Sequence, residues 1–474
     1  MTDPTALSAT ALSAAIQSGE LTAEAVMAAY LKRIHTLNPK INAIVSLRPD
    51  DQLLAEAQAS DRERQAGRSL GWMHGLPIAI KDLSEVKGIP CTYGSPLFRD
   101  FIPDFDEIQV ERIRTAGAII IGKTNTPEWG FGSHSYNPVF GVTRNPYDLS
   151  RSAGGSSGGA GAALAARLVP VADGSDMMGS LRNPAAFNNV VGFRPSFGRV
   201  PSLRGRDAYL NQLATTGPMG RSVADVVALL NTQSGYDRRD PSSYDSAPIL
   251  LDPAIAKAGG RIGWLGDYNG YLPFEPGVLA LSETALKVFD GLGFVAERAM
   301  PDFDIERLWW AWTTLRSFLT AGSMRDFYED PGKRGSLKPE ILHEVRTGLK
   351  VSASDVYEAS ALRTLWYQAM LTLFDRYDYL IAPAAQVFPF DADIPWPRTI
   401  AGQHMDTYHR WMEVVIGPSM AGLPVAALPA GFNTHGLPTG FQLIGRPRSD
   451  GDVLSLAALY EQATKWLGHL PKLE

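Results

Sequence analysis

The sequence reads Leu76-Pro-Ile-Ala-Ile-Lys81-Asp82 at the point where a short apolar run ends on a lysine and an aspartate. A second apolar run, Ala118-Ile-Ile-Ile121, is expected to enter a loop at Gly122, and a helix is predicted between the two runs, over about residues 106–115. Continuous apolar runs bounded by turn residues are typical of central strands buried on both faces. A strand, a helix and a second strand in this order predict an α/β fold.

The rest of the chain supports one large domain. Apolar residues at helical spacing predict two helices within about residues 8–37, with Thr22 as the N-cap of the second and Asn38-Pro39 ending it. Later elements are predicted as helices over about 158–168, 223–234 and 453–466 and as strands over 379–382, 425–428 and 440–444. We therefore predict a single domain over 1–474, comprising N-terminal helices (about 5–70), a core segment (about 71–235), a helical insertion that acts as a lid (about 304–377) and C-terminal strands and a helix (about 378–474).

Composition excludes several classes of protein. Of 474 residues, 45% are hydrophobic and 20% are charged, and the net charge of −6 offers no basic surface for nucleic acid. The single cysteine, Cys91, rules out an intrachain disulfide and favours a reducing compartment. We see no signal peptide and no stretch near the ~20 apolar residues of a membrane helix. The expectation is a cytoplasmic monomer or homodimer that acts on a small molecule.

Lys81 is unusual because it follows an apolar strand. Burial removes water from an ammonium group, and a lysine that is mostly neutral near pH 7.5 needs its pKa lowered by roughly 3 from ~10.4, or about 4 kcal/mol. Such a lysine can deprotonate a hydroxyl. The alternative is a structural lysine paired with Asp82 or with the C-terminal end of a helix.

Two serine motifs supply candidate hydroxyls. Gly154-Gly-Ser-Ser-Gly-Gly159 lets the backbone approach a ligand closely, although a flexible loop or a serine-capped helix start would also use it. Ser180 follows Gly174-Ser-Asp-Met-Met-Gly179, a turn whose successive N–H groups could hold the oxyanion of a tetrahedral intermediate. The alternative for Ser180 is an ordinary solvated turn.

Taken together, these motifs resemble those of the amidase signature family. The resemblance extends over nearly the whole chain in one order, through Gly75-Leu-Pro-Ile-Ala-Ile-Lys81-Asp, Gly122-Lys-Thr-Asn-Thr-Pro-Glu128, Thr143-Arg-Asn-Pro-Tyr-Asp, Gly154-Gly-Ser-Ser-Gly-Gly, Gly179-Ser-Leu-Arg-Asn-Pro-Ala185, Val191-Gly-Phe-Arg-Pro195, Gly217-Pro-Met-Gly-Arg221, Gly422-Leu-Pro-Val and Gly436-Leu-Pro-Thr-Gly-Phe-Gln-Leu-Ile-Gly445. It implies an α/β/α fold around a mixed, mostly parallel twisted sheet, and a Ser–cis-Ser–Lys triad that hydrolyses amides without cofactor or metal.

The resemblance also implies a role for each site residue. Ser180 would be the nucleophile, Ser156, on a cis peptide, the proton relay, and Lys81 the base. The backbone amides of four residues would form the oxyanion hole, and three further residues would support the triad by hydrogen bonds: Met177, Met178, Gly179 and Ser180 in the first set and Ser157, Asp176 and Arg182 in the second. The family usually has glycine where this chain has Met178, so we expect Met178 to keep a negative φ and its side chain to line the pocket.

Aromatic residues suggest the substrate. Five are predicted to line a wide apolar cleft, although core packing is the ordinary role of each: Tyr136, Trp309, Trp310, Trp312 and Phe318, with Trp396 as a further option. Such a cleft suits aryl or alkyl amides and aryl carbamates, the substrates of aryl acylamidases and urethanases.

Other motifs suggest different sites. Gly154-Gly-Ser156-Ser-Gly158 fits a hydrolase nucleophile elbow, which would need His435 or His469. Gly117-Ala-Ile-Ile-Ile-Gly-Lys123-Thr124 matches a phosphate loop by letter, but its apolar run favours a strand. His404 and His409 are poorly spaced for a metal on a helix. The amidase-like subunit of a tRNA-dependent amidotransferase shares the triad and remains the main alternative.

Overall fold

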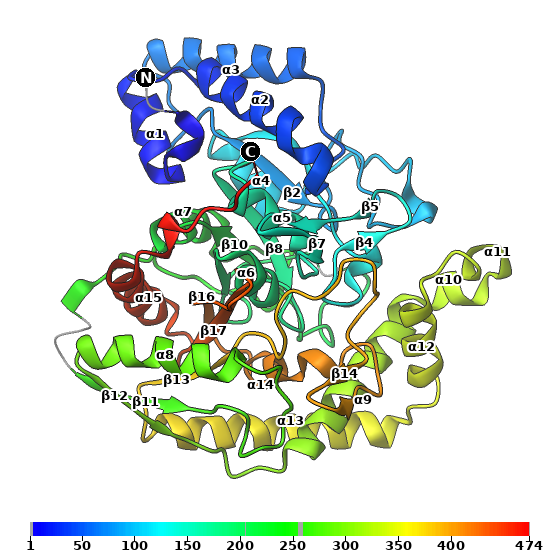
Figure 1. The fold of residues 1–474 in the computed structure, drawn as a ribbon. Coiled ribbons are helices and arrows are strands. Elements are labelled where there is room, and N and C mark those ends of the chain that lie inside the picture. Colours follow the sequence, from blue (N-terminus) through cyan, green and yellow to red (C-terminus); the bar gives the residue numbers. More distant parts are fainter. Residues whose placement is uncertain (1–2, 204, 255–258, 474) are drawn as a thin grey trace.

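A single large sheet organises the molecule. Within residues 3–203, 205–254 and 259–473, which the computed structural model describes, this sheet has eleven strands in the order β1-β3-β2-β8-β10-β9-β16-β17-β13-β11-β12 (Figure 1). Their bounds are β1 Ile44–Val45, β2 Pro77–Lys81, β3 Ile119–Thr124, β8 Val171–Asp176, β9 Val191–Arg194, β10 Thr215–Gly220, β11 Gly260–Trp264, β12 Phe294–Arg298, β13 Tyr379–Pro383, β16 Val425–Phe432 and β17 Pro438–Ile444. Parallel pairs occur in two blocks, β3-β2-β8 and β13-β11-β12, and the strands between them pair antiparallel, so the sheet is mixed.

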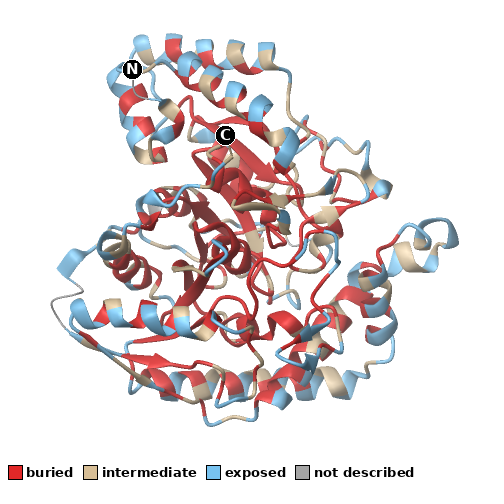
Figure 2. Ribbon diagram, in the orientation of Figure 1, coloured by how far each residue is buried: buried red, intermediate tan, exposed pale blue. Residues whose placement is uncertain are grey.

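Helices cover both faces of this sheet. On one face, α5 (Gly158–Ala165) and α6 (Arg182–Asn188) share a core with α2 (Ala23–Ile41). On the other face lie α4 (Ile108–Thr115), α7 (Val223–Gln233), α8 (Val278–Gly291) and α15 (Asp450–Thr464). Buried residues concentrate in the strands and on the inner faces of the helices (Figure 2). The predicted α/β/α class is confirmed.

The faces alternate along β16 as the pleat requires. Ala427 packs toward the α5–α6 side, whereas its neighbours Ala426 and Leu428 pack toward α8 and α15. The N-terminal helices α1 (Ala9–Ser18), α2 and α3 (Asp50–Gln65) form a group at one end of the molecule, at the top of Figure 1.

Two predicted boundaries are wrong. Helix α2 does not stop at Asn38-Pro39 but runs to Ile41, because Pro39 falls in its last turn and Asn42, in the left-handed region, ends it. Strand β3 does not end at Gly122 either. It continues to Thr124, and its register with β2 shifts by one residue where Ile78 gives way to Ala79.

The predicted helical stretch is a set of packed helices. It comprises α9 (Ile305–Ser323), α10 (Arg325–Glu329), α11 (Pro331–Arg334), α12 (Pro339–Gly348) and α13 (Ala353–Phe374), with α9 packed against both α12 and α13. Its role as a lid stays a prediction. None of the helices in the described ranges has the length and apolar character needed to cross a bilayer.

Candidate active site

Lys81 is the last residue of β2, in the middle of a parallel block of the sheet. Its side chain is 1% exposed. The Nζ donates to Ser156 Oγ at 2.7 Å, to Ser157 Oγ at 2.8 Å and to Ser175 Oγ at 3.1 Å. Three hydroxyls therefore surround one buried amine, and they come from the loop before α5 and from the end of β8. The alternative was a structural ion pair between Lys81 and Asp82. Asp82 is instead paired with Lys123, with 3.9 Å between Asp82 Oδ1 and Lys123 Nζ.

The surroundings of Lys81 favour its neutral form. Burial lowers the pKa of Lys81 from its ordinary value of 10.5 to about 7, against the opposing influence of the Asp173 and Asp176 charges. Asp173 Oδ1 accepts the backbone N–H of Lys81 at 2.8 Å, and burial raises the pKa of Asp173 to about 6. A large fraction of Lys81 is thus able to accept a proton near neutral pH.

The glycines around Ser156 allow its loop to pack tightly. The Gly155–Ser156 peptide bond is cis. A Cβ on Gly159 would lie 2.3 Å from the backbone nitrogen of Asn125, so no larger residue fits there. Helix α5 begins at Gly158, directly after the two serines. Close backbone packing, rather than flexibility, explains the glycine-rich motif.

Ser180 lies in a turn between β8 and α6, adjacent to the Ser156–Ser157 loop. The Ser157 N–H donates to the Ser180 carbonyl oxygen at 3.1 Å, which joins the two serine segments directly. Within the turn, Gly179 has a φ of +77°, and a Cβ there would lie 2.8 Å from Val415 Cγ2. The turn therefore depends on glycine at position 179.

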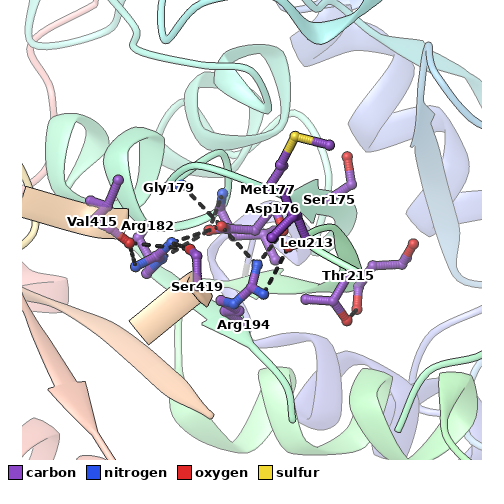
Figure 3. Close-up of polar contacts among 12 residues, drawn as sticks. Ser175, Asp176, Met177, Gly179, Arg182, Arg194, Leu213, Thr215, Val415 and Ser419 are labelled. Atoms are coloured by element: carbon purple, nitrogen blue, oxygen red, sulfur yellow. Dashed lines mark hydrogen bonds and ion pairs between the residues drawn. The ribbon is translucent and has the colours of Figure 1, made fainter. Parts of the chain in front are cut away.

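Asp176 anchors this turn. Its carboxylate accepts the N–H groups of Gly179 at 2.9 Å and of Leu181 at 3.1 Å. It also binds Arg182 in a bidentate pair at 2.8 and 3.0 Å, and Arg194 at 3.2 Å (Figure 3). Burial alone would raise the pKa of Asp176, but Arg182 and Arg194 outweigh it and hold that pKa well below its usual range.

Arg182 also hydrogen-bonds to residues in the C-terminal half of the chain. Arg182 donates to the Val415 carbonyl oxygen at 2.8 Å, to Ser419 Oγ at 2.6 Å and to the Gln442 side chain. The predicted supporting roles of Asp176 and Arg182 thus have a geometric counterpart.

The predicted oxyanion hole needs one correction. The Gly179 N–H points to Asp176 and is not free for a substrate. The N–H groups of Met177, Met178 and Ser180 have no hydrogen-bond acceptor within the described ranges, so these three are the candidate donors.

Met178 behaves differently from our expectation in one respect. The expectation that Met178 avoids a positive φ agrees with the structure, because the positive φ of the turn falls on Gly179. The Met178 side chain, however, is 5% exposed and packs in the core, so it does not line a pocket. Met177 is the residue of the pair that retains exposed surface.

The aromatic residues divide into three groups. Trp312 has no exposed surface and therefore belongs to the core, which argues against its predicted pocket role. Trp310 is 39% exposed and has no partner ring in the described chain, and its pocket role stays a prediction. Trp309 is buried against His409. Tyr136 and Phe318 are half-buried, and Tyr136 lies under the Lys338 ammonium, 4.3 Å from its ring centroid.

Sequence reasoning missed three polar residues that contact Lys81 or the turn before Ser180. Ser175 contacts Lys81, Asp173 binds the backbone of Lys81, and Arg316 on α9 contacts the Met177 sulfur at 2.9 Å. Ser175 and Asp173 lie within or next to the motif that precedes Ser180, and strand alternation could have placed them. Nothing in the sequence around Arg316 indicates its contact with a residue 139 positions away.

The rival sites do not form. His435 and His469 are exposed, and neither hydrogen-bonds to Ser156 in the described ranges. The segment of the phosphate-loop pattern from Ile119 to Thr124 is strand β3. His409 is buried against Thr407 and Glu344, and the described residues contain no cluster of three or more metal-ligating side chains.

Known proteins resemble this chain over nearly its whole length, including the segments that form the site. The amidase family model matches residues 25–454. An acylamidase from Rhodococcus erythropolis is 34% identical over 98% of this chain and 97% of its own length. A glutamyl-tRNA(Gln) amidotransferase subunit from Chloroflexus aurantiacus is 34% identical over 100% of both chains. The solved structure of a bacterial aryl acylamidase, an amidase signature enzyme, superposes with a TM-score of 0.89 and 29% identity over 98% of both chains.

Proposed function

The chain belongs to the amidase family, and from that premise we propose that it is a serine hydrolase that cleaves the C–N bonds of aryl or alkyl amides and of aryl carbamates. The observation that carries the proposal is the 2.7 Å contact between the buried Lys81 amine and Ser156 Oγ. An amine held by hydroxyls, with a pKa of about 7, is equipped to accept a proton in a water-poor site.

The proposed proton path runs from Ser180 through Ser156 to Lys81. Neutral Lys81 takes the Ser156 proton while Ser156 takes that of Ser180, whose Oγ attacks the substrate carbonyl carbon. The N–H groups of Met177, Met178 and Ser180 receive the oxyanion. Each such donor contributes about 10²–10³ in rate.

The cycle then returns the proton. Lys81 gives it back through Ser156 to the leaving nitrogen, the C–N bond breaks, and Ser180 is left as an acyl ester. Water, deprotonated by the same path, hydrolyses the ester and restores the serine. Ser157 and Ser175 hold the Lys81 amine in place at both stages.

Substrate class is proposed from the relatives and from the site. An acylamidase and an aryl acylamidase are among the proteins that this chain resembles over nearly its whole length. Met177, which retains exposed surface in the nucleophile turn, and the apolar cluster that it packs against, which includes Phe131 and Trp309, suit an aryl or alkyl group. Aryl carbamates present the same resonance-stabilised C–N bond with an aromatic leaving group.

The test combines trapping with a substrate panel. A serine-directed fluorophosphonate should label Ser180 of the wild-type protein, as mapped by peptide mass spectrometry, and should not label Ser180→Ala. The panel would contain an acetanilide, a fatty amide, acetamide and an aryl carbamate. Labelling of a different serine with retained activity in Ser180→Ala would overturn the mechanism, and turnover of acetamide alone would overturn the substrate class.

A second function is favoured by one comparison. The 34% identity to a glutamyl-tRNA(Gln) amidotransferase subunit over the full chain makes the glutamine-hydrolysing component of a tRNA-dependent complex the alternative. Glutaminase assays separate the two. Release of ammonia from glutamine on mixing with the other components of such a complex, together with no turnover of anilides, would select this alternative.

A further inference from the structure

Arg316, on α9, is a buried cation beside the candidate nucleophile turn. Its Nε donates to Glu344 Oε1 at 2.9 Å and its Nη2 donates to the Tyr408 hydroxyl at 2.8 Å. Its Nη1 donates to the Met177 sulfur at 2.9 Å. Arg316 is 8% exposed, and it also lies over the ring of Phe131, 4.9 Å from the centroid.

Two chain segments place Arg316 on the same side as the triad. The first is the end of β8: Ser175 contacts Lys81, and Met177, two residues further, extends to the same side as Ser175 while Asp176 points to its arginines (Figure 3). The second is the loop before Phe131, where a Cβ on Gly130 would lie 3.5 Å from Ser156 Oγ. The Arg316 guanidinium thus contacts Met177, two residues from the Ser175 that touches Lys81, and Phe131, which directly follows Gly130 beside Ser156.

The Nη1 group has the poorest partner of the three nitrogens. A guanidinium carries five N–H donors, and a thioether sulfur is only a weak acceptor. Within the described part of the chain, Nη1 has no acceptor other than Met177 Sδ. A buried charged donor with a weak partner gains free energy when a better acceptor arrives. Met177 is flexible and retains exposed surface, so a ligand oxygen can replace its sulfur.

The local charge selects a neutral oxygen. Glu344 already balances Arg316, and it is buried together with Ser317 and Tyr408, whose hydroxyls both donate to it. Burial raises the pKa of Glu344, but Arg316 outweighs it and keeps that pKa well below its usual range. A carboxylate ligand would therefore add an unbalanced negative charge to a buried site. A carbonyl oxygen adds none.

We propose that Arg316 Nη1 binds a second carbonyl oxygen of the substrate, separate from the carbonyl that Ser180 attacks, and so selects amides or carbamates that carry a further amide, carbamate or ester group. The proposal rests on the proposed function and deepens it. It assigns Arg316 as a determinant of specificity rather than as part of the proton path.

Matched anilides test the proposal. On the acyl side, the 4-nitroanilide of N-acetylglycine carries a second carbonyl, and the 4-nitroanilide of pentanoic acid has the same chain length without it. On the amine side, meta-acetyl and meta-isopropyl acetanilide form the equivalent pair. The measured quantity is the ratio of kcat/KM within each pair, compared between wild type and variant, which cancels differences in intrinsic reactivity.

The variant must not leave Glu344 as an unpaired buried charge. Arg316→Met combined with Glu344→Gln removes both charges and keeps similar volumes. We expect the double variant to lower the ratio for at least one pair by about 10- to 100-fold, the effect of losing a hydrogen bond to a charged donor. Arg307→Met is the control, because Arg307 lies on the same helix and is exposed, with Glu358 at 3.4 Å.

Met177→Leu distinguishes substrate binding from a structural role. If Nη1 binds the substrate, replacing the sulfur leaves the preference for the second carbonyl intact. Equal ratios in wild type and the double variant for both pairs, with the pentanoyl anilide still hydrolysed, would overturn the role of Arg316 and leave the proposed function standing. Failure of wild type to hydrolyse any of the four anilides, the fatty amide or the aryl carbamate would overturn both.

Discussion

Replacing Lys81 by methionine should change how stability depends on pH. Lys81 is buried with its pKa lowered from 10.5 to about 7. Between these two values the unfolded chain holds a proton at this position that the folded chain does not. Raising the pH through this window therefore favours the folded state, and the unfavourable contribution of Lys81 is largest below pH 7 and absent above pH 10.5.

The size of the effect follows from the two pKa values. The interval between 10.5 and about 7 corresponds to roughly 5 kcal/mol below pH 7, at about 1.36 kcal/mol for each pH unit. Between pH 6 and pH 9, wild type should gain about 2.5 kcal/mol of unfolding free energy from Lys81 alone. Lys81→Met is isosteric and uncharged, so it should lack this gain.

The assay is guanidinium chloride unfolding of both proteins at pH 6 and pH 9. Groups remote from Lys81 titrate equally in the two proteins, so the difference between them reports Lys81 together with Asp173, whose pKa the Lys81 charge lowers. Lys287→Met is the control, because Lys287 is exposed on α8 and should behave as wild type. At pH 9 the activity of Lys81→Met on a cleaved anilide should fall by about 10²–10⁴, the contribution of a general base. Stability changes between pH 6 and pH 9 that agree within about 0.5 kcal/mol in wild type and Lys81→Met would refute the reasoning.

Three further substitutions test the turn and its contacts. Asp176→Asn leaves two buried arginines without their charged partner and should lower the unfolding free energy by about 3–5 kcal/mol, seen as a large fall in Tm; an unchanged Tm would contradict the anchoring role. Gly179→Ala places a Cβ 2.8 Å from Val415 at a φ of +77°, and kcat should drop by at least about 10²; retained kcat would show that the turn tolerates the change. Ser157→Ala removes one hydroxyl at 2.8 Å from Lys81, and kcat/KM should fall about tenfold with little change in Tm; full activity would assign the lysine contact to the other hydroxyls alone.

Local patterns predicted several elements of the fold, including the strand that carries Lys81. The apolar run ending at Lys81 is β2, and the predicted helix over 223–234 is α7, because burial on both faces and helical periodicity both leave short-range signals. The end of α2 was predicted too early, because the free energy that a proline such as Pro39 costs a helix depends on its position within the helix. Strands β11 and β12 were not predicted, because neither has a continuous apolar run or a regular alternation of buried and exposed residues. Helix α8, which connects them, was not predicted either.

The site was predictable only where its residues are close together in the sequence. Ser175, Asp176 and Ser180 are near neighbours, so a turn with a candidate nucleophile is visible in the sequence. The orientation of aromatic side chains is not: Trp310 and Trp312 are two residues apart on α9 and face solvent and core. The Arg316–Glu344 pair spans 28 residues and two helices, and its link to Met177 depends on how the helical insertion packs.

The contacts of Arg182 lead us to expect that activity requires both halves of the chain. All three proposed catalytic residues lie before residue 181, so an expressed fragment ending near residue 235 would contain each of them. Yet the guanidinium that grips the base of the nucleophile turn is itself held by Val415, Ser419 and Gln442. Such a fragment would keep every proposed catalytic residue but lose the partners that hold Arg182 in place. We therefore expect proteolysis or truncation just before Val415 to abolish activity.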